Sequence, residues 1–289
     1  MDPSAPVEIP SEDHGLVPAG DGAELYYESY GSEEDGAPVV TTINTFYLLA
    51  QVWRGFSTQL AHRNRIIAWD LRNQGGSKPG RAPLTWETLV EDLRCLLDHL
   101  QVRRTYLLGT SISCFIARDF ALRYPDRVAG CIMQAPAFSP YGPRRREMIT
   151  EAWLQTLAAS GTDGLWRHMY GEAYCGQTQE VMGVAGYLDL RQMFSTVHRE
   201  DQLREFIELS LPVPDGPEPL HRLTCPVLLQ VGDGDFLWSA SQAEDTLGLL
   251  QRGKLDVIPR SGHVATMENP HEFEASVQRF LGEVEAGKL

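Results

Sequence analysis

The sequence has 289 residues, of which 43% are hydrophobic and 22% are charged, so it can bury a large core and form one catalytic domain with an insertion. Its formal net charge of −14 disfavours nucleic acid and anionic membranes as partners. No stretch has the length of a transmembrane helix, and residues 1–6 lack the basic start of a secretory signal. We therefore expect a cytoplasmic protein.

Six short runs of apolar residues are spaced along the chain, and each has the length of a β-strand. Such a run is typical of a parallel strand that is covered on both faces. The runs cover residues 38–43, 65–70, 105–108, 128–134, 226–231 and 254–258. Between two of them, residues 86–100 place leucines on one helical face. The alternation predicts an α/β fold with a mostly parallel central sheet and helices on both faces.

This alternation stops between the fourth and the fifth run. Residues 138–220 are rich in Trp, Tyr, Met, Arg and Gly, with helical patterns near 146–158 and 201–209. An insertion here lies over the carboxyl ends of the strands, where ligands bind in open α/β sheets. We expect a lead-in at residues 1–21, a core formed by residues 22–137 and 221–289, and a helical cap formed by residues 138–220.

The five cysteines are odd in number and widely spaced. They are Cys95, Cys114, Cys131, Cys175 and Cys225. Several lie in apolar runs, which favours reduced core residues over a disulfide framework. No pair has the spacing of metal ligands, and no glycine-rich phosphate loop follows a strand. We therefore expect no metal and no cofactor.

The segment Gly109-Thr110-Ser111-Ile112-Ser113 lies between an apolar strand and a helical pattern. A turn this tight forces its middle residue toward positive φ and exposes the Ser111 hydroxyl, the setting of a nucleophile elbow. The segment resembles the G-x-S-x-G motif of the α/β-hydrolase superfamily, with Ser113 in place of the last glycine. A serine at this position excludes the branches of that family that use aspartate, namely haloalkane dehalogenases and epoxide hydrolases.

The resemblance implies an acid and a histidine later in the chain, in that order. The histidine is His263, which follows the last strand and precedes an N-P-x-x-F helix entry. The acid is expected in Gly232-Asp233-Gly234-Asp235, which resembles the G-D-x-D turn of the family. We assign Asp235 and keep Asp233 as the alternative; its structural role would be to order the turn. Some relatives carry the acid one strand earlier, but residues 134–138 contain no carboxylate.

Two backbone amides should hold the oxyanion of such an enzyme. The resemblance implies one from Ile112 and one from Phe46. Where the family has H-G-x, this chain reads Asn44-Thr45-Phe46-Tyr47. Asn44 could order this loop or bind the substrate directly, and we predict substrate contacts for Asn44, Thr45 and Tyr47. Because threonine restricts the backbone more than glycine does, the replacement is a departure from the pattern of ordinary esterases.

Residues 70–77 resemble the D-x-R-G-x-G-x-S loop of the family, with Asn73 in place of a glycine. Asparagine tolerates a left-handed backbone, so the turn can survive the change. We expect a structural role for Asp70 and Arg72, which would organise the loop beneath the active site.

Three functions follow from these patterns. The first is a serine hydrolase acting on an ester, thioester or lactone of a mid-sized organic molecule. The second is a lyase that eliminates an acyloxy group such as acetate, because the altered loops resemble those of hydrolase-like tailoring enzymes of polyketide-type natural-product pathways. The third is a binding protein without turnover, which the presence of Ser111, Asp235 and His263 disfavours. The aromatic and Met content of the expected cap suggests an apolar pocket.

Overall fold

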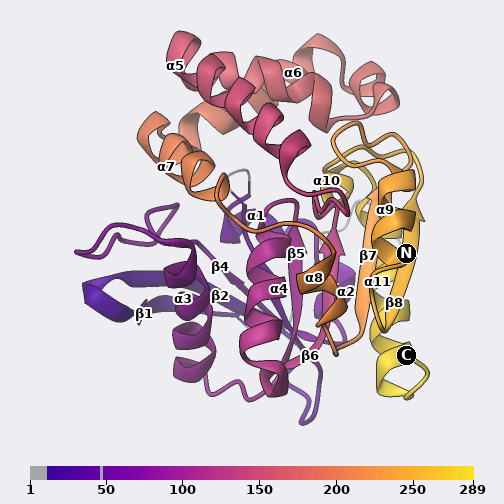
Figure 1. The fold of residues 1–289 in the computed structure, drawn as a ribbon. Coiled ribbons are helices and arrows are strands. Elements are labelled where there is room, and N and C mark those ends of the chain that lie inside the picture. Colours follow the sequence, from indigo (N-terminus) through magenta and orange to yellow (C-terminus); the bar gives the residue numbers. More distant parts are fainter. Residues whose placement is uncertain (1–11, 46–47) are drawn as a thin grey trace, which may run out of the picture.

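The computed structural model describes residues 12–45 and 48–289. Its centre is a sheet with the strand order β1-β2-β4-β3-β5-β6-β7-β8 (Figure 1). The strands are β1 (Glu12–Pro18), β2 (Glu24–Gly31), β3 (Val39–Ile43), β4 (Arg65–Trp69), β5 (Thr105–Thr110), β6 (Val128–Gln134), β7 (Val227–Gly232) and β8 (Gly253–Ile258). β2 is antiparallel to both of its neighbours, whereas β4, β3, β5, β6, β7 and β8 are mutually parallel. The predicted mostly parallel sheet is confirmed.

Helices cover both faces of this sheet. They are α1 (Ala50–Trp53), α2 (Thr58–Ala61), α3 (Trp86–His99), α4 (Ser113–Arg123), α8 (Pro217–His221), α9 (Ala240–Leu247), α10 (Ala265–Glu268) and α11 (Pro270–Glu285), with single 3-10 turns at Gly20–Gly22 and Pro125–Arg127. Alternate residues of β5 supply two hydrophobic clusters. Leu107 packs with residues of α3 and α4, and Leu108 packs with residues of α2 and α11. Because successive side chains of a strand point to opposite faces, the continuous apolar runs mark strands with two buried faces.

Two of the strands were not predicted from the sequence. In β2, Glu24, Glu28 and Ser29 interrupt the Leu and Tyr residues, so the segment has no long continuous apolar run. β1 forms an antiparallel hairpin with it at one edge of the sheet. An antiparallel edge pair can face water on one side, and its weaker apolar pattern follows from that position.

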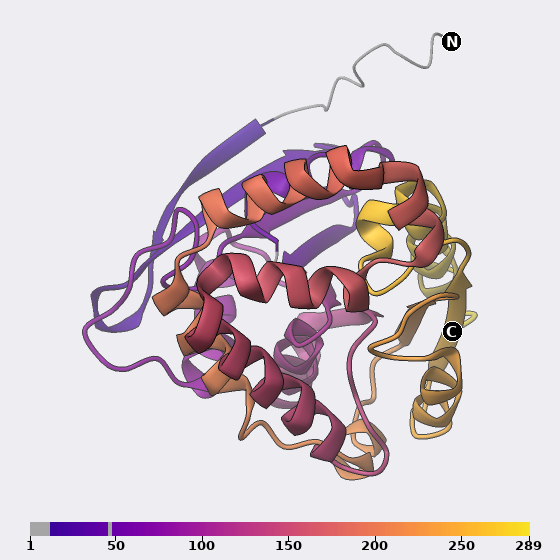
Figure 2. The ribbon, with the colours of Figure 1, turned by 90° about the horizontal axis from the view of Figure 1, so that it is seen from above.

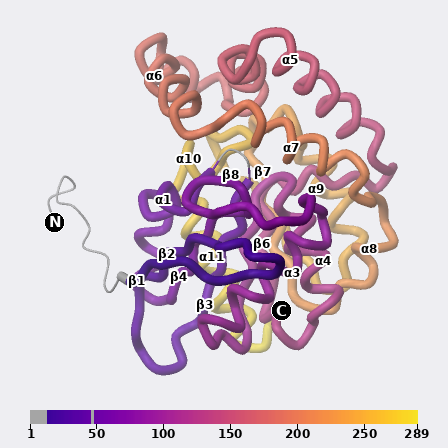
Figure 3. Tube along the Cα trace, turned by 90° about the vertical axis from the view of Figure 1, so that its left-hand side faces the viewer, coloured from indigo at the N-terminus to yellow at the C-terminus, as the bar shows by residue number. Residues whose placement is uncertain are grey.

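Between β6 and β7, before the short helix α8, the chain forms three helices: α5 (Arg144–Ala173), α6 (Gly176–Val197) and α7 (Glu200–Ser210). α5 is broken at Gly161 (φ 63°) and α6 at Gly183 (φ 56°). The three helices lie together at one end of the sheet, seen from above in Figure 2 and from the side in Figure 3. The predicted helices near 146–158 and 201–209 lie within α5 and α7, and the division into core and cap at residues 138 and 220 stays a prediction.

No helix within residues 12–45 and 48–289 is long and apolar enough to cross a membrane. All five cysteines are free, and Cys114, Cys131 and Cys175 are buried, in agreement with the expectation of reduced thiols. Burial raises the pKa of the Cys114 thiol well above its usual value, so the unreactive thiol form dominates at neutral pH.

Candidate active site

Ser111 lies in the turn between β5 and α4 with φ 51°, the positive value that the motif predicts. Its backbone N–H donates to the carbonyl oxygen of Gln134 on the neighbouring strand at 2.8 Å. Gly109 makes the turn possible, because a Cβ there would lie 3.0 Å from the backbone nitrogen of Cys114. The elbow therefore presents the half-buried Ser111 side chain at the carboxyl end of β5.

Ser113, which replaces the last glycine of the motif, is fully buried. Its hydroxyl accepts a hydrogen bond from the N–H of Thr110 at 2.9 Å and lies 2.7 Å from the carbonyl oxygen of Ile43, to which it can donate. The serine thus ties the elbow to β3, and its hydroxyl both accepts and donates within the protein. The replacement is accommodated as a structural contact.

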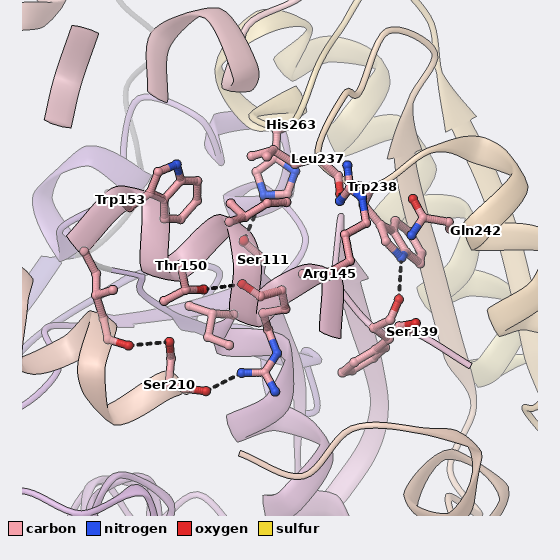
Figure 4. A pocket seen from close by; sticks show the side chains of 16 residues that line it. Ser111, Ser139, Arg145, Thr150, Trp153, Ser210, Leu237, Trp238, Gln242 and His263 are labelled. Atoms are coloured by element: carbon pink, nitrogen blue, oxygen red, sulfur yellow. Dashed lines mark hydrogen bonds between the residues drawn. The ribbon is translucent and has the colours of Figure 1, made fainter. Parts of the chain in front are cut away.

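The three predicted catalytic side chains meet at one place (Figure 4 labels two of them, Ser111 and His263). His263 Nε2 lies 2.8 Å from Ser111 Oγ, and its Nδ1 lies 3.0 Å from Asp235 Oδ2. Asp235 and His263 are buried. Asp233 is exposed, and its Oδ1 accepts from the backbone N–H of Ser261 at 3.2 Å. Of the two candidate acids, Asp235 contacts the imidazole, whereas Asp233 ties its turn to the loop that carries His263.

Backbone contacts fix the orientation of the Asp235 carboxylate. Its Oδ1 accepts from the N–H groups of Leu237 (2.8 Å) and Trp238 (2.9 Å). The indole of Trp238 donates to the carbonyl oxygen of Phe138 at 2.9 Å, which ties this turn to the segment after β6. A buried carboxylate needs such partners, and here they leave Oδ2 directed at the imidazole.

The loop that carries His263 is bound to the end of α5. The N–H of His263 donates to the carbonyl oxygen of Ala173 at 2.8 Å, and the Gln134 side chain donates to the His263 carbonyl at 2.8 Å. The Glu268 carboxylate accepts from the N–H groups of Gly262 (2.6 Å) and Cys175 (2.8 Å). The imidazole therefore takes its position from both the sheet and the helical insertion.

The glycine that ends β7 sets the distance between the acid turn and the histidine loop. A Cβ on Gly232 would lie 2.3 Å from the carbonyl oxygens of both Ser261 and Gly262. We expect Gly232→Ala to lower the free energy of unfolding by about 1–3 kcal/mol. Because the displaced loop carries His263, turnover should also fall, by up to about 100-fold.

Urea denaturation and ester-hydrolysis rates check the effect of Gly232→Ala. Gly282→Ala is the control, because a Cβ on this residue, in the last turn of α11, meets nothing within 4 Å. Alanine is favoured over glycine in a helix by up to about 1 kcal/mol, so this variant should be equally or more stable. Equal stability and activity of both variants would contradict the tight contact.

Of the two expected oxyanion amides, only that of Ile112 lies within the described residues. Ile112 precedes α4 and lines the cavity beside Ser111, and its backbone N–H hydrogen-bonds to none of the described residues. This donor is therefore not engaged by the described residues, and its role toward a substrate carbonyl stays a prediction. Phe46 and Tyr47 lie outside the described residues. Thr45 is buried and lines a cavity together with Ser111 and His263, the position expected of a residue that contacts substrate.

Asn44 does not contact either cavity at Ser111. Its side chain is fully buried, and its Nδ2 donates to Asp70 Oδ1 at 3.1 Å while its Oδ1 accepts from the indole of Trp53 at 2.6 Å. Of the two roles considered for Asn44, these contacts favour the ordering of the loop, and direct substrate binding stays an untested prediction. A buried amide with both ends engaged cannot turn to a ligand without leaving a partner unsatisfied.

Asp70 organises the loop beneath the site, as predicted. Its carboxylate also accepts from the N–H groups of Ala50 (2.7 Å) and Gly76 (2.9 Å). Burial raises the pKa of the Asp70 carboxyl, and these hydrogen bonds oppose the shift. Arg72 forms a buried two-pronged ion pair with Asp92 at 2.6 and 2.9 Å, an arrangement that fixes both side chains.

Two cavities flank the Ser111–His263 pair. The larger has a volume of about 60 Å³ and the smaller about 40 Å³. Ser111, His263, Leu237 and Trp153 line both. Trp153 is one of the aromatic residues expected around the substrate. Trp166 instead packs against four other rings, those of Tyr170, Tyr174, Tyr187 and Phe194, so most aromatic residues of the insertion form its own core.

Sequence reasoning missed several polar residues of the larger cavity, including Arg145, Arg146, Thr150 and Gln242. The one available signal was the run of three arginines at residues 144–146, at the start of the first helix of the insertion. In the part of the chain that the structure describes, no cluster of His, Cys, Asp and Glu could hold a metal ion.

The serine lies in a turn between a strand and a helix, next to a histidine and an aspartate. The sheet is mostly parallel and carries a helical insertion. Together these features define a hydrolase with the α/β-hydrolase fold. The sequence profile of the alpha/beta hydrolase family matches residues 43–276, more than half of the chain. The protein belongs to this family, and it is an esterase-like hydrolase.

Three similar proteins support this assignment. An esterase from Thermogutta terrifontis has a TM-score of 0.81 at 25% identity, with 94% of this chain and 99% of that chain covered. A carboxylesterase of Bacillus subtilis (strain 168) is 23% identical over 78% of this chain and 77% of its own length. A second protein of that organism, provisionally named a 2-succinyl-6-hydroxy-2,4-cyclohexadiene-1-carboxylate synthase, is 23% identical over 86% of this chain and 91% of its own.

Proposed function

We propose that this protein cleaves an ester, thioester or lactone through an acyl-enzyme formed on Ser111. The observation that carries the proposal is the continuous contact from Asp235 through His263 to Ser111, with distances of 3.0 and 2.8 Å. A serine hydroxyl becomes a good nucleophile only when a base can take its proton, and the base must itself be oriented. The three side chains meet both requirements.

In the proposed reaction, Ser111 Oγ attacks the substrate carbonyl while His263 Nε2 takes the hydroxyl proton. Asp235 holds the proton of His263 on Nδ1, so that Nε2 is the accepting nitrogen. The Ile112 N–H stabilises the negative charge on the carbonyl oxygen, with a second N–H expected from Phe46. His263 then protonates the leaving group. A water molecule deprotonated by His263 attacks the acyl-enzyme, releases the acid and restores Ser111.

The substrate we propose is a mid-sized organic molecule bound beneath a cap formed by residues 138–220. Residues of α5 and α7, including Thr150 and Ile207, line the same cavity as Ser111. Cavities of this kind, mostly apolar with a few polar groups, are typical of small-molecule sites. The names of the Thermogutta esterase and the Bacillus carboxylesterase support an ester as the scissile group.

Elimination of an acyloxy group is the second candidate. The observation that favours it is the replacement of the family's His-Gly by Asn44-Thr45 next to the nucleophile, which alters the loop that supplies the second oxyanion amide. The Bacillus relative that is named a synthase is consistent with a reaction other than hydrolysis on this scaffold. In this alternative His263 would remove a carbon-bound proton, and the carboxylate would leave intact.

One substrate separates the two reactions. 4-Acetoxy-2-butanone in ¹⁸O-water gives 4-hydroxy-2-butanone and acetate by hydrolysis, but but-3-en-2-one and acetate by elimination. Hydrolysis through an acyl-enzyme places one ¹⁸O in each acetate, and elimination places none. We expect labelled acetate and the alcohol, measured by mass spectrometry after subtraction of the rate with Ser111→Ala. If unlabelled acetate and the enone form faster than without enzyme, the reaction is elimination and the hydrolysis proposal is wrong.

A further inference from the structure

Two adjacent arginines, Arg145 and Arg146, lie at the start of α5 and line the larger cavity together with Ser111 and His263. Arg145 is partly exposed, and Arg146 is buried with 9% of its surface exposed. Figure 4 shows Arg145 beside Leu237 and Trp238, on the turn that holds the Asp235 carboxylate. The cavity that contains the nucleophile therefore carries two positive charges.

The hydrogen-bond partners of both guanidinium groups are neutral. Arg145 donates to the carbonyl oxygens of Leu237 and Phe236, the latter at 2.9 Å. Arg146 donates to the carbonyl oxygens of Ser210 and Val213, the latter at 2.6 Å. Within residues 12–45 and 48–289, neither arginine forms an ion pair with a carboxylate.

Each guanidinium has five N–H donors, so these contacts leave several unused. The Nε of Arg146 is buried and has no hydrogen-bond partner among the described residues. Leaving a buried donor without a partner is unfavourable, and more so when the group is charged. The two arginines that line the cavity thus retain N–H donors that no described residue accepts from.

The charges around Arg146 do not neutralise the pair. Arg118 forms an ion pair with Asp119 at 2.7 Å. Asp215 attracts both Arg118 and Arg146, but its carboxylate accepts from the backbone N–H groups of Ser139 and Gly216. Burial raises the pKa of Asp215 and lowers the pKa of Arg146. One buried carboxylate is therefore shared between two arginines, and Arg145 adds a further charge.

We propose that Arg145 and Arg146 bind a carboxylate of the substrate, so that the preferred substrates are esters, thioesters or lactones with a free carboxylate. The inference rests on the proposed function, because it places the scissile carbonyl at Ser111. Guanidinium groups match carboxylates in geometry and charge, and a cavity with low-dielectric walls strengthens the attraction. The chain as a whole has a net charge of −14 and therefore repels anions. A local positive site on such a chain selects for those anions that fit it.

Matched 4-nitrophenyl esters test the inference. The anionic set is the mono-4-nitrophenyl esters of succinate, glutarate and adipate, and the neutral match is 4-nitrophenyl hexanoate. We expect kcat/KM to be at least 10-fold higher for one of the anionic esters than for the hexanoate, after subtraction of spontaneous hydrolysis. Arg145→Gln and Arg146→Gln should lower kcat/KM at least 10-fold for that ester and less than 3-fold for the hexanoate.

The control is Arg144→Gln, because Arg144 is exposed and does not line the cavity. For this variant, kcat/KM for the anionic ester and for the hexanoate should both stay within 2-fold of the wild-type values. Arg145→Lys keeps the positive charge but loses the planar guanidinium group with its paired donors. Its kcat/KM for the anionic ester should therefore lie between those of Arg145→Gln and the wild type. Equal loss on both ester types would indicate a structural role for the arginines and overturn the inference.

Failure of the inference can be told apart from failure of the proposed function. Ser111-dependent hydrolysis of the hexanoate without an anionic preference overturns only the carboxylate site. If no ester is hydrolysed, calorimetric titration of glutarate into Ser111→Ala still decides the matter. Saturable binding that Arg145→Gln weakens at least 10-fold supports the site, and absence of saturable binding overturns it.

Discussion

Ser111→Ala is expected to lower kcat for ester hydrolysis by about 10⁴-fold or more, equivalent to about 5 kcal/mol or more of transition-state stabilisation. The substitution removes the attacking oxygen and leaves His263 without the proton that it takes, whereas the elbow and the Ile112 amide remain. Steady-state rates with short-chain aryl esters measure the loss, and circular dichroism verifies the fold.

Ser113→Ala provides the matched control, two residues further along the chain. The Ser113 hydroxyl is buried and hydrogen-bonded to backbone groups of Thr110 and Ile43, so its removal leaves Thr110 N–H without a partner. The expected cost is about 1–3 kcal/mol of unfolding free energy, with kcat reduced by less than about 10-fold. If the two variants lose the same activity, Ser111 has no special role in the chemistry.

The second large effect is expected for Asp235→Asn, with a loss in kcat of about 10⁴-fold at neutral pH. The N–H groups of Leu237 and Trp238 should hold the amide oxygen of the new side chain. Its NH₂ group then faces His263 Nδ1. This contact places the imidazole proton on Nε2, directed at Ser111, so that the histidine can no longer act as the base.

Asp233→Asn tests the choice between the two acids. Asp233 is exposed, and among the hydrogen bonds of the described residues its side chain accepts only from the backbone N–H of Ser261, on the loop that carries His263. We expect kcat to fall by less than about 10-fold. The reverse order, with the larger loss at position 233, would move the acid to Asp233 and contradict the contact seen at His263.

The sequence predicted the sheet where its signal was local. The runs that became β3 to β7 are apolar on both faces because both faces are covered, and the turns after β5 and β7 carry short motifs with fixed geometry. The hairpin of β1 and β2, at the edge of the sheet, escaped prediction because its strands mix polar and apolar residues without a long apolar run.

Contacts between distant segments explain what the sequence could not reveal. The meeting of Ser111, Asp235 and His263 was predicted only through the family resemblance, since 152 residues separate Ser111 from His263. Nothing local showed that Asn44 would contact Asp70 and Trp53, because those partners are positioned by packing. Likewise, no local pattern showed that Arg145 and Arg146 would line the cavity with Ser111, because the packing of α5 brings them there.

The central claim is that the oxygen of Ser111 is the nucleophile, and labelling with a fluorophosphonate tests it most directly. Peptide mass spectrometry after treatment of the native protein should find one adduct per chain, on the peptide that contains Ser111, and none in Ser111→Ala. Absence of an adduct on folded protein that turns over an ester, or an adduct that persists in Ser111→Ala, would contradict the proposed mechanism.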